Sequence, residues 1–525
     1  MPTNVRRATR WARSLVLVPI AATVLLPASA ATAVAHNTAV IAHTDKGVVR
    51  GTRVDGVRSF LGVPYAAPPV GEMRWRPPQP ASAWHGVRDA TALGPHCAQP
   101  ATPFGGASTS EDCRYLNVYT PSFVVPELGL APVMVWIHGG ALVVGESDDY
   151  DPADLVARGV IVVTINYRLG ALGFLSHPAL TAESPNHASG NFGLLDQQAA
   201  LRWVQRNARA FGGNPRNVTI FGESAGGLSV HSQLASPLAT GLFDRAIIQS
   251  GAYLLDPPTL AAAEAAGSTF ATRAGCAVQT VACLRSLPVT TVLARQAGGS
   301  PTVDGYVLTQ SLAGAFTSGA FNHVPVVQGS NHDEWRLFVA QTEATTGAPL
   351  SAAAYVPTVA ATLGISIAAA TALTAAYPLS AYPSPSIALG AVGTDAIFAC
   401  NARRVAGLLS QHVPTYQYEF NDPNAPQPFF PSVSFPTGAY HAAELQYLFG
   451  FSRGTPPFTS EQVALSQTMV RYWTRFAWAG NPNAPRTPDW PRYDTATQLF
   501  QALVPGTSRT DTGFAADHKC SLFGG

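Results

Sequence analysis

Short apolar runs alternate along the chain with segments of helical periodicity. Residues 194–211 place Leu201, Val204 and Ala208 on one face before the chain reaches Gly212, which predicts an amphipathic helix and its end. The apolar runs predict buried strands, and they cover residues 133–137, 160–165, 218–221, 246–249 and 324–328. This alternation indicates an α/β fold, in which helices cover both faces of a large, mostly parallel, twisted sheet. The length of the chain adds the expectation of long insertions.

The first residues have a different pattern. Four arginines precede an apolar run over residues 15–26, and small residues follow it. This order predicts a secretory signal peptide over residues 1–35, cleaved after Ala30 or Ala35, ahead of a folded domain over residues 36–525. The apolar run is shorter than the roughly 20 residues of a membrane span. We therefore expect a secreted, extracellular protein without a stable membrane anchor.

The composition excludes two classes of protein. Of 525 residues, 47% are hydrophobic and only 12% are charged, which is too apolar for a disordered chain. An alanine-rich stretch over residues 351–377 is interrupted by Pro357 and Gly364, so packed helices and loops are expected there rather than a span. The 32 basic and 31 acidic residues give a charge of +1, and loss of the four leader arginines leaves 28 against 31, or −3. We expect no nucleic acid partner, because the chain has no excess of basic residues.

Six cysteines in an exported chain favour disulfides over a metal site. The paired C-x-x-C and histidine spacings typical of metal ligands are absent. The pairs suggested by the sequence are Cys97 with Cys113, Cys276 with Cys283 and, across the sequence, Cys400 with Cys520. The alternative for Cys400 or Cys520 is a buried free thiol.

A G-x-S-x-G motif identifies a candidate nucleophile. Gly222-Glu-Ser-Ala-Gly226 follows the predicted strand 218–221 and precedes a helical run over residues 225–234. In this strand, turn and helix context the two glycines allow a tight turn that exposes the serine above the sheet. We therefore predict that Ser224 is a nucleophile.

A serine nucleophile also needs donors for the oxyanion that it creates. Gly139 and Gly140 follow the predicted strand 133–137, where bare backbone N–H groups can face a substrate oxygen. We predict an oxyanion hole formed by Gly139, Gly140 and the N–H of Ala225. The alternative is an ordinary glycine turn.

Taken together, these residues resemble the type-B carboxylesterases, the α/β-hydrolase family that includes cholinesterases, fungal lipases and bacterial para-nitrobenzyl esterases. The resemblance extends over nearly the whole chain after the leader. The matching blocks, in order, are residues 60–65, 111–118, 138–140, 166–168, 191–197, 221–227 and 249–251. The resemblance implies that residues 36–525 form an α/β-hydrolase catalytic domain.

The resemblance also implies the acid and the base of a catalytic triad. Within residues 329–334 the position of the family's acid matches Glu334, and the neighbouring Asp333 is the alternative. The position of the family's base matches His441. The order Ser224, Glu334, His441 is the chain order of α/β-hydrolase triads.

Other positions follow from the same resemblance. It implies a supporting polar network of Glu223, Ser250 and Glu444, although Glu223 on its own could be a solvated acid at a helix start. His138 and His332 are interpreted as positioning or surface residues. Three positions depart from the family, which often has glycine where this chain has Ala141, Trp335 and Ala442. We expect these larger residues to narrow the space near the hole and the acid.

The implied function is that of a secreted serine carboxylesterase, which hydrolyses small or medium carboxylic esters through an acyl-enzyme on Ser224. The segment between Cys97 and Cys113 is too short for the lid of related lipases and has one aromatic residue, Phe104, which disfavours a choline ester. A lipase acting on longer acylglycerols at an interface is the alternative, and a non-catalytic binding protein on the same fold is a second one. No metal, nucleotide or organic cofactor is implied, and the oligomeric state stays open.

Overall fold

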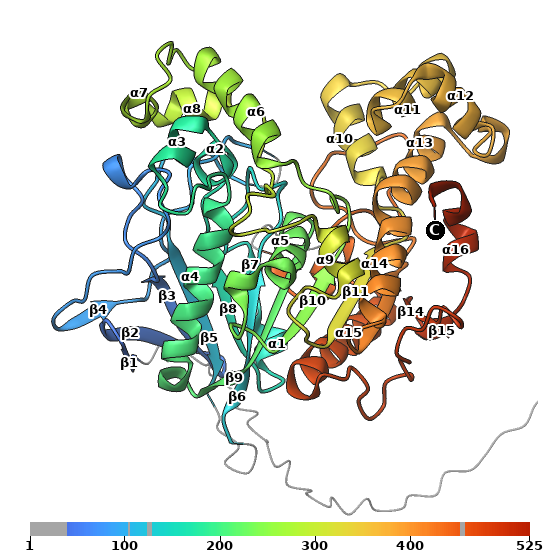
Figure 1. Ribbon diagram of the computed structural model, residues 1–525. Helices are drawn as coiled ribbons and strands as arrows, with labels where there is room; N and C mark the ends of the chain where they lie inside the picture. Colours follow the sequence, from blue (N-terminus) through green and yellow to red (C-terminus); the bar gives the residue numbers. More distant parts are fainter. Residues whose placement is uncertain (1–38, 103–104, 123–128, 452–456, 525) are drawn as a thin grey trace, which may run out of the picture. The chain divides into compact units, whose positions relative to one another are not determined.

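A large mixed sheet runs through the protein (Figure 1). The structure, a computed structural model, describes residues 39–102, 105–122, 129–451 and 457–524. The sheet strands within these ranges are β1 Val40–Thr44, β2 Gly47–Val54, β3 Val57–Pro64, β4 Val87–Asp89, β5 Tyr115–Pro121, β6 Ala131–Ile137, β8 Ile161–Ile165, β9 Gly213–Glu223, β10 Arg245–Gln249, β11 Val326–Asn331, β12 Thr415–Phe420, β14 Phe500–Leu503 and β15 Arg509–Asp511. Two further strands, β7 Tyr150–Asp151 and β13 Gly450–Phe451, pair with each other.

The centre of the sheet is parallel and its edges are antiparallel. The strand order is β1-β2-β3-β5-β8-β6-β9-β10-β11-β12-β14-β15, and β4 lies beside β2. Each neighbouring pair from β8 to β14 is parallel. The pairs along β1-β2-β3-β5-β8 and the pair β14-β15 are antiparallel, and β4 pairs parallel with β2. The predicted fold class is confirmed.

Helices cover both faces of the sheet. Alternate residues of β6 show the two faces, because Val133, Val135 and Ile137 belong to one apolar core, and Met134 and Trp136 belong to another. The helices are α1 Ala153–Val156, α2 Gly170–Phe174, α3 Pro178–Glu183, α4 Phe192–Asn207, α5 Ala225–Ala235, α6 Leu260–Arg273, α7 Val281–Ser286, α8 Val289–Arg295, α9 Leu312–Ser318, α10 Arg336–Thr346, α11 Tyr355–Leu363, α12 Ile367–Thr374, α13 Pro385–Gly393, α14 Cys400–Ser410, α15 Ser460–Ala479 and α16 Phe514–Asp517. Residues of α4, α5, α9 and α14 join the first core, and residues of α1 and α15 join the second.

The insertions expected from the chain length form two helical groups. Figure 1 shows α6 to α8 as one group and α10 to α13 as another, both above the strands. Each group has a small apolar core of its own. Residues 351–377 therefore form packed helices, as predicted. Among the described residues no single helix is long and apolar enough to cross a membrane. The helical segments Ala352–Leu363 and Ile367–Ala381, which are bent by 113° at the break between them, reach the required length and apolar composition only when they are taken together.

The predicted element boundaries differ from the structure by a few residues, for local reasons. Strand β11 begins at Val326 rather than at residue 324, because Pro325 has no N–H for the ladder. Helix α4 begins at Phe192, two residues earlier than predicted. Its continuation, Ala208–Phe211, is a 3₁₀ turn that ends at Gly212 with φ 89°.

The described residues contain three disulfides, in the pairs that the sequence suggested. They join Cys97 to Cys113, Cys276 to Cys283 and Cys400 to Cys520. No cysteine in the described part of the chain is free, so the alternative of a buried thiol does not hold. The leader over residues 1–35 and its cleavage after Ala30 or Ala35 lie outside the described residues and stay predictions.

Candidate active site

The turn between β9 and α5 holds Ser224 in a strained conformation. Its φ is 53° and its ψ is −120°, a combination that residues with a side chain rarely adopt. The flanking glycines make the turn sterically feasible. A Cβ on Gly222 would lie 2.6 Å from the carbonyl carbon of Gly226, and a Cβ on Gly226 would overlap the carbonyl oxygen of Ile137. The predicted motif therefore forms the predicted turn.

Glu334, and not Asp333, faces His441. The Nδ1 atom of His441 lies 2.5 Å from Oε2 of Glu334, and both side chains are buried. Asp333 instead accepts a hydrogen bond from the backbone N–H of Ala439 and pairs with Arg336 at 2.8 Å. The alternative acid is thus turned away from the imidazole.

One cavity brings the predicted site residues together. It has a volume of about 330 Å³, and Ser224, His441, Gly139 and Gly140 all line it. Ala225 is the first residue of α5. Because the first N–H groups of a helix have no acceptor within that helix, the N–H of Ala225 has no acceptor within α5. The rest of the wall is largely apolar, with aromatic rings from Tyr150, Phe338, Phe429 and Phe451.

The glycine turn after β6 packs directly against the serine. A Cβ on Gly139 would lie 3.2 Å from the Cβ of Ser224. His138 is fully buried, its Nδ1 lies 2.8 Å from the carbonyl oxygen of Gly139, and its ring stacks on Tyr167 with centroids 4.5 Å apart. Burial lowers the pKa of His138 to about 4, so the ring is neutral and can donate to that carbonyl. The interpretation of His138 as a positioning residue fits this geometry.

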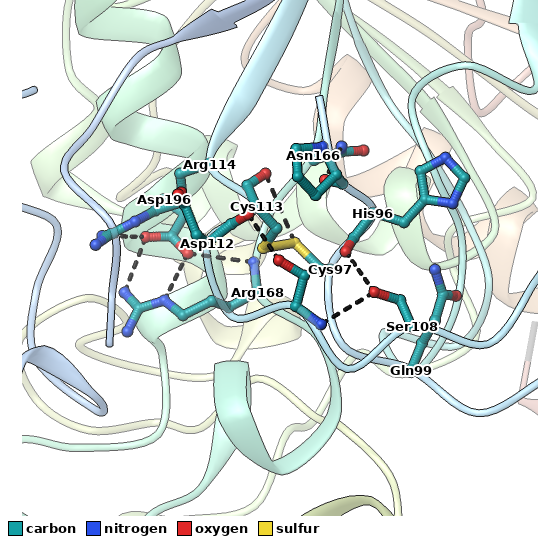
Figure 2. Close-up of a disulfide and its surroundings, with 12 residues drawn as sticks. His96, Cys97, Gln99, Ser108, Asp112, Cys113, Arg114, Asn166, Arg168 and Asp196 are labelled. Carbon is teal, nitrogen blue, oxygen red and sulfur yellow. Dashed lines mark hydrogen bonds and ion pairs between the residues drawn. A yellow bond between two sulfur atoms is a disulfide. The ribbon is translucent and has the colours of Figure 1, made fainter. Parts of the chain in front are cut away.

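The loop closed by the Cys97–Cys113 disulfide holds the glycine turn from outside. Buried Gln99 accepts a hydrogen bond of 2.7 Å from the N–H of Gly145 and donates one of 3.3 Å to its carbonyl oxygen. Gly145 in turn lies against Gly139, since a Cβ on Gly145 would be 2.6 Å from the Gly139 carbonyl oxygen. Figure 2 shows Gln99 beside this disulfide. The sequence analysis did not identify Gln99, because no motif links it to the glycine turn.

A buried ion cluster supports the other side of this disulfide. Arg168 makes two hydrogen bonds to Asp196, of 2.7 and 2.8 Å, and Arg114 lies 3.2 Å from the same carboxylate (Figure 2). All three side chains are at most 4% exposed. Since a planar guanidinium matches a carboxylate in this two-bonded arrangement, the cluster fixes α4 against the segment that precedes β5 and the loop that follows β8.

Two residues of the predicted supporting network, Ser250 and Glu444, lie in separate sets of contacts. Ser250 donates a 2.5 Å hydrogen bond to Oε1 of Glu334. Glu444 accepts hydrogen bonds from Gln249 and Asn331, of 3.0 and 2.6 Å. Sequence reasoning missed Gln249 and Asn331, which are strand residues without a motif of their own.

Three carboxylates make the electrostatics of the site unusual. The Oε1 atom of Glu223 lies 3.2 Å from Nε2 of His441. Burial raises the pKa of Glu223 to about 8 and that of Glu444 to about 7. Burial alone would lower the pKa of His441, but Glu223 and Glu334 raise it to about 9. The imidazole thus titrates under the control of its carboxylate neighbours.

The three departures from the family pattern have different surroundings. Ala141 and Ala442 line the cavity and have positive φ values of 56° and 70°, so they narrow it as expected. Trp335 is not one of the described residues that line the cavity. It stacks on Phe338 with centroids 4.5 Å apart, and its indole lies where a Cβ on Gly393 would be. Trp335 therefore contributes to the packing beside the acid and not to the described wall of the cavity.

A parallel sheet with a serine at a strained turn between strand and helix, followed in the chain by an acid and a histidine, defines an α/β-hydrolase. The chain belongs to the carboxylesterase family, whose model matches residues 38–521. It is 37% identical to the acylcarnitine hydrolase of Mus musculus over 89% of this chain and 88% of that one, and 37% identical to the cocaine esterase of Homo sapiens over 86% and 85%. The fumonisin B1 esterase of Sphingopyxis macrogoltabida is 44% identical, over 57% of each chain. The protein is a carboxylic ester hydrolase of the type-B family, and its three disulfides fit a secreted or lumenal enzyme.

Proposed function

We propose that this protein is a secreted serine carboxylesterase that hydrolyses small or medium esters through an acyl-enzyme on Ser224. The observation that carries the proposal is the single cavity lined by Ser224, His441, Gly139 and Gly140. His441 is already held in a fixed orientation there by the 2.5 Å contact with Glu334. The catalytic roles below follow from this arrangement.

The reaction proceeds in two halves. Neutral His441 takes the hydroxyl proton of Ser224 as Oγ attacks the ester carbonyl carbon, and the imidazolium then returns that proton to the leaving alcohol. Glu334 orients the ring and stabilises its charged form. Backbone N–H groups of Gly139, Gly140 and Ala225 stabilise the oxyanion. Water attacks the acyl-enzyme with His441 again as base, which releases the acid and restores Ser224.

The cavity supports a substrate of limited size. Its volume of about 330 Å³ is at the lower end of the roughly 300–1,000 Å³ typical of small-molecule sites. A lipase acting at an interface is the alternative, and Phe104 in the short disulfide loop lies outside the described residues. The proposal of secretion is supported by the leader pattern and by the three disulfides.

Replacing Ser224 with alanine tests the proposal. We expect Ser224→Ala to reduce kcat for para-nitrophenyl butyrate by at least about 10⁴-fold, with an unchanged melting temperature. The matched control is Ser232→Ala on the same helix, since Ser232 Oγ donates only to the carbonyl oxygen of Leu228. Full turnover by Ser224→Ala would refute the assignment. Rates for acyl chains from acetate to palmitate, with and without an emulsion, separate esterase from lipase, because only a lipase accelerates at the emulsion.

A further inference from the structure

Two histidines and a glutamate meet beside the turn that follows β11 and carries Glu334. His332 follows β11, Glu419 lies in β12, and His518 follows α16. One ligand atom from each residue lies within 4.8 Å of the other two. The ring centroids of the two histidines are 5.3 Å apart. Two imidazoles on one tetrahedral zinc ion have centroids about 5 Å apart, given N–Zn distances of about 2.0–2.1 Å.

Each histidine of this cluster is oriented by a carboxylate. The Nδ1 atom of His518 lies 2.7 Å from Oδ1 of Asp395, which also accepts a 2.8 Å hydrogen bond from the hydroxyl of Tyr377 through its other oxygen. The Nδ1 atom of His332 lies 3.2 Å from Oδ1 of Asp333. Histidines that bind metals almost always have their second nitrogen held in this way. The Nε2 atom of His518 faces Glu419.

The buried carboxylates around His518 carry enough negative charge to balance a divalent cation. The carboxylates of Asp395 and Glu419 are only 4% and 5% exposed, and within the described ranges the salt bridges of both are made to His518. Beside neutral imidazoles these two carboxylates carry a charge of −2, which one divalent ion between Nε2 of His518 and Glu419, 2.6 Å apart, would balance.

Ions can reach the cluster from solvent. A cavity of about 390 Å³ is lined by both histidines together with Arg336, Tyr382, Asp517 and Lys519. Arg336 pairs with Asp333, and the Lys519 ammonium lies 4.6 Å from the centroid of the Tyr377 ring. These cations therefore have partners other than Glu419. The side chain of His332 is 36% exposed, which places it at the entrance.

We propose that His332, Glu419 and His518 bind one divalent transition-metal ion, with zinc as the expected metal and the fourth position open toward this cavity. Two imidazole nitrogens and one carboxylate oxygen are a zinc donor set, whereas calcium and magnesium require oxygen ligands. Such an ion would join the turn after β11, the strand β12 and the segment that the Cys400–Cys520 disulfide fixes. It holds His332, two residues before Glu334, and so stabilises the turn that presents the acid.

The test is a zinc titration of the full chain, free of a polyhistidine tag and dialysed against EDTA. We expect calorimetry to give one zinc ion per chain, and Co²⁺ to give the visible absorption of a four-coordinate site. His332→Ala and Glu419→Gln should each weaken binding at least about tenfold. The control is the double variant His323→Ala and His412→Ala, which removes another pair of histidines, with ring centroids 5.8 Å apart, and should bind as the wild type does.

Two results would overturn the site. They are the absence of zinc binding by the wild type, which leaves His518 as an ion-paired imidazolium, and equal binding by His332→Ala and the wild type. His332→Ala keeps the test decisive if Glu419→Gln fails to fold, because His332 lies at the surface. The titration is repeated with Ser224→Ala, which should bind zinc as the wild type does. The zinc titration therefore tests the metal site independently of the proposed esterase mechanism.

Discussion

Replacing Glu223 with glutamine removes the carboxylate that lies 3.2 Å from Nε2 of His441. Burial lowers the pKa of His441, and the charges of Glu223 and Glu334 more than reverse this effect, raising it to about 9. Only the neutral imidazole can accept the serine proton, so kcat/KM rises with pH as His441 deprotonates. Without the Glu223 charge the pKa of His441 falls. The rise in kcat/KM therefore moves to lower pH.

The size of the shift follows from the distance between the charges. Two unit charges 3.2 Å apart interact by roughly 5 kcal/mol at an effective dielectric constant of about 20. Glu223 has only part of its charge at neutral pH, because burial raises its own pKa to about 8. One pH unit corresponds to about 1.4 kcal/mol. We therefore expect Glu223→Gln to move the acid limb of the profile by about one to two pH units.

The assay is kcat/KM for para-nitrophenyl butyrate, measured between about pH 5 and pH 9 at the isosbestic wavelength of para-nitrophenol. The matched control is Glu444→Gln, because Glu444 makes its hydrogen bonds to Gln249 and Asn331 and contributes least among the groups that raise the pKa of His441. It should move the limb by less than half as much. An unchanged limb in Glu223→Gln, a move to higher pH, or an equal move in Glu444→Gln would refute the electrostatic argument.

Two further substitutions test the surroundings of the site. Gln99→Leu should lower kcat roughly 10- to 100-fold with little change in KM, because the hydrogen bonds that fix Gly145 are lost and the oxyanion donors are displaced. Steady-state kinetics measure this effect, with Gln79→Leu at an exposed position as the control. An unaltered kcat in Gln99→Leu would contradict the prediction. Asp196→Asn should cost about 3–5 kcal/mol of unfolding free energy, since Arg168 and Arg114 would remain buried without a counter-charge. Urea denaturation measures the loss, and a midpoint like that of the wild type would show that the cluster does not stabilise the fold.

The parallel centre of the sheet could be predicted because its strands are continuous apolar runs. Strand β12 was missed, although all six of its residues are buried. Its polar residues Gln417 and Glu419 alternate with aromatic residues, a pattern typical of a half-exposed strand. Glu419 is buried only because His518, far away in the sequence, meets it at 2.6 Å. Partners of this kind cannot be found from local periodicity.

The residues of the candidate site also fall into those that the sequence could predict and those that it could not. Ser224 and its glycines were predictable because the steric conflict that they avoid is local to one turn. Spacing could not choose between Glu334 and Asp333, which are neighbours in the sequence, and the choice rested on family resemblance until the orientation of the two side chains was known. Gln99 acts through a loop that joins the site only in three dimensions. The cluster with His332 was equally hidden, since its residues come from three distant segments.

Trp335 and Gly393 limit how this enzyme can change. The indole of Trp335 occupies the place of a Cβ on Gly393, so any side chain at position 393 requires a smaller residue at position 335 first. Conversely, a glycine at position 335 would leave an unfilled space beside Phe338. The two positions are therefore coupled, and either substitution alone should lower the stability of the fold by more than the two substitutions together.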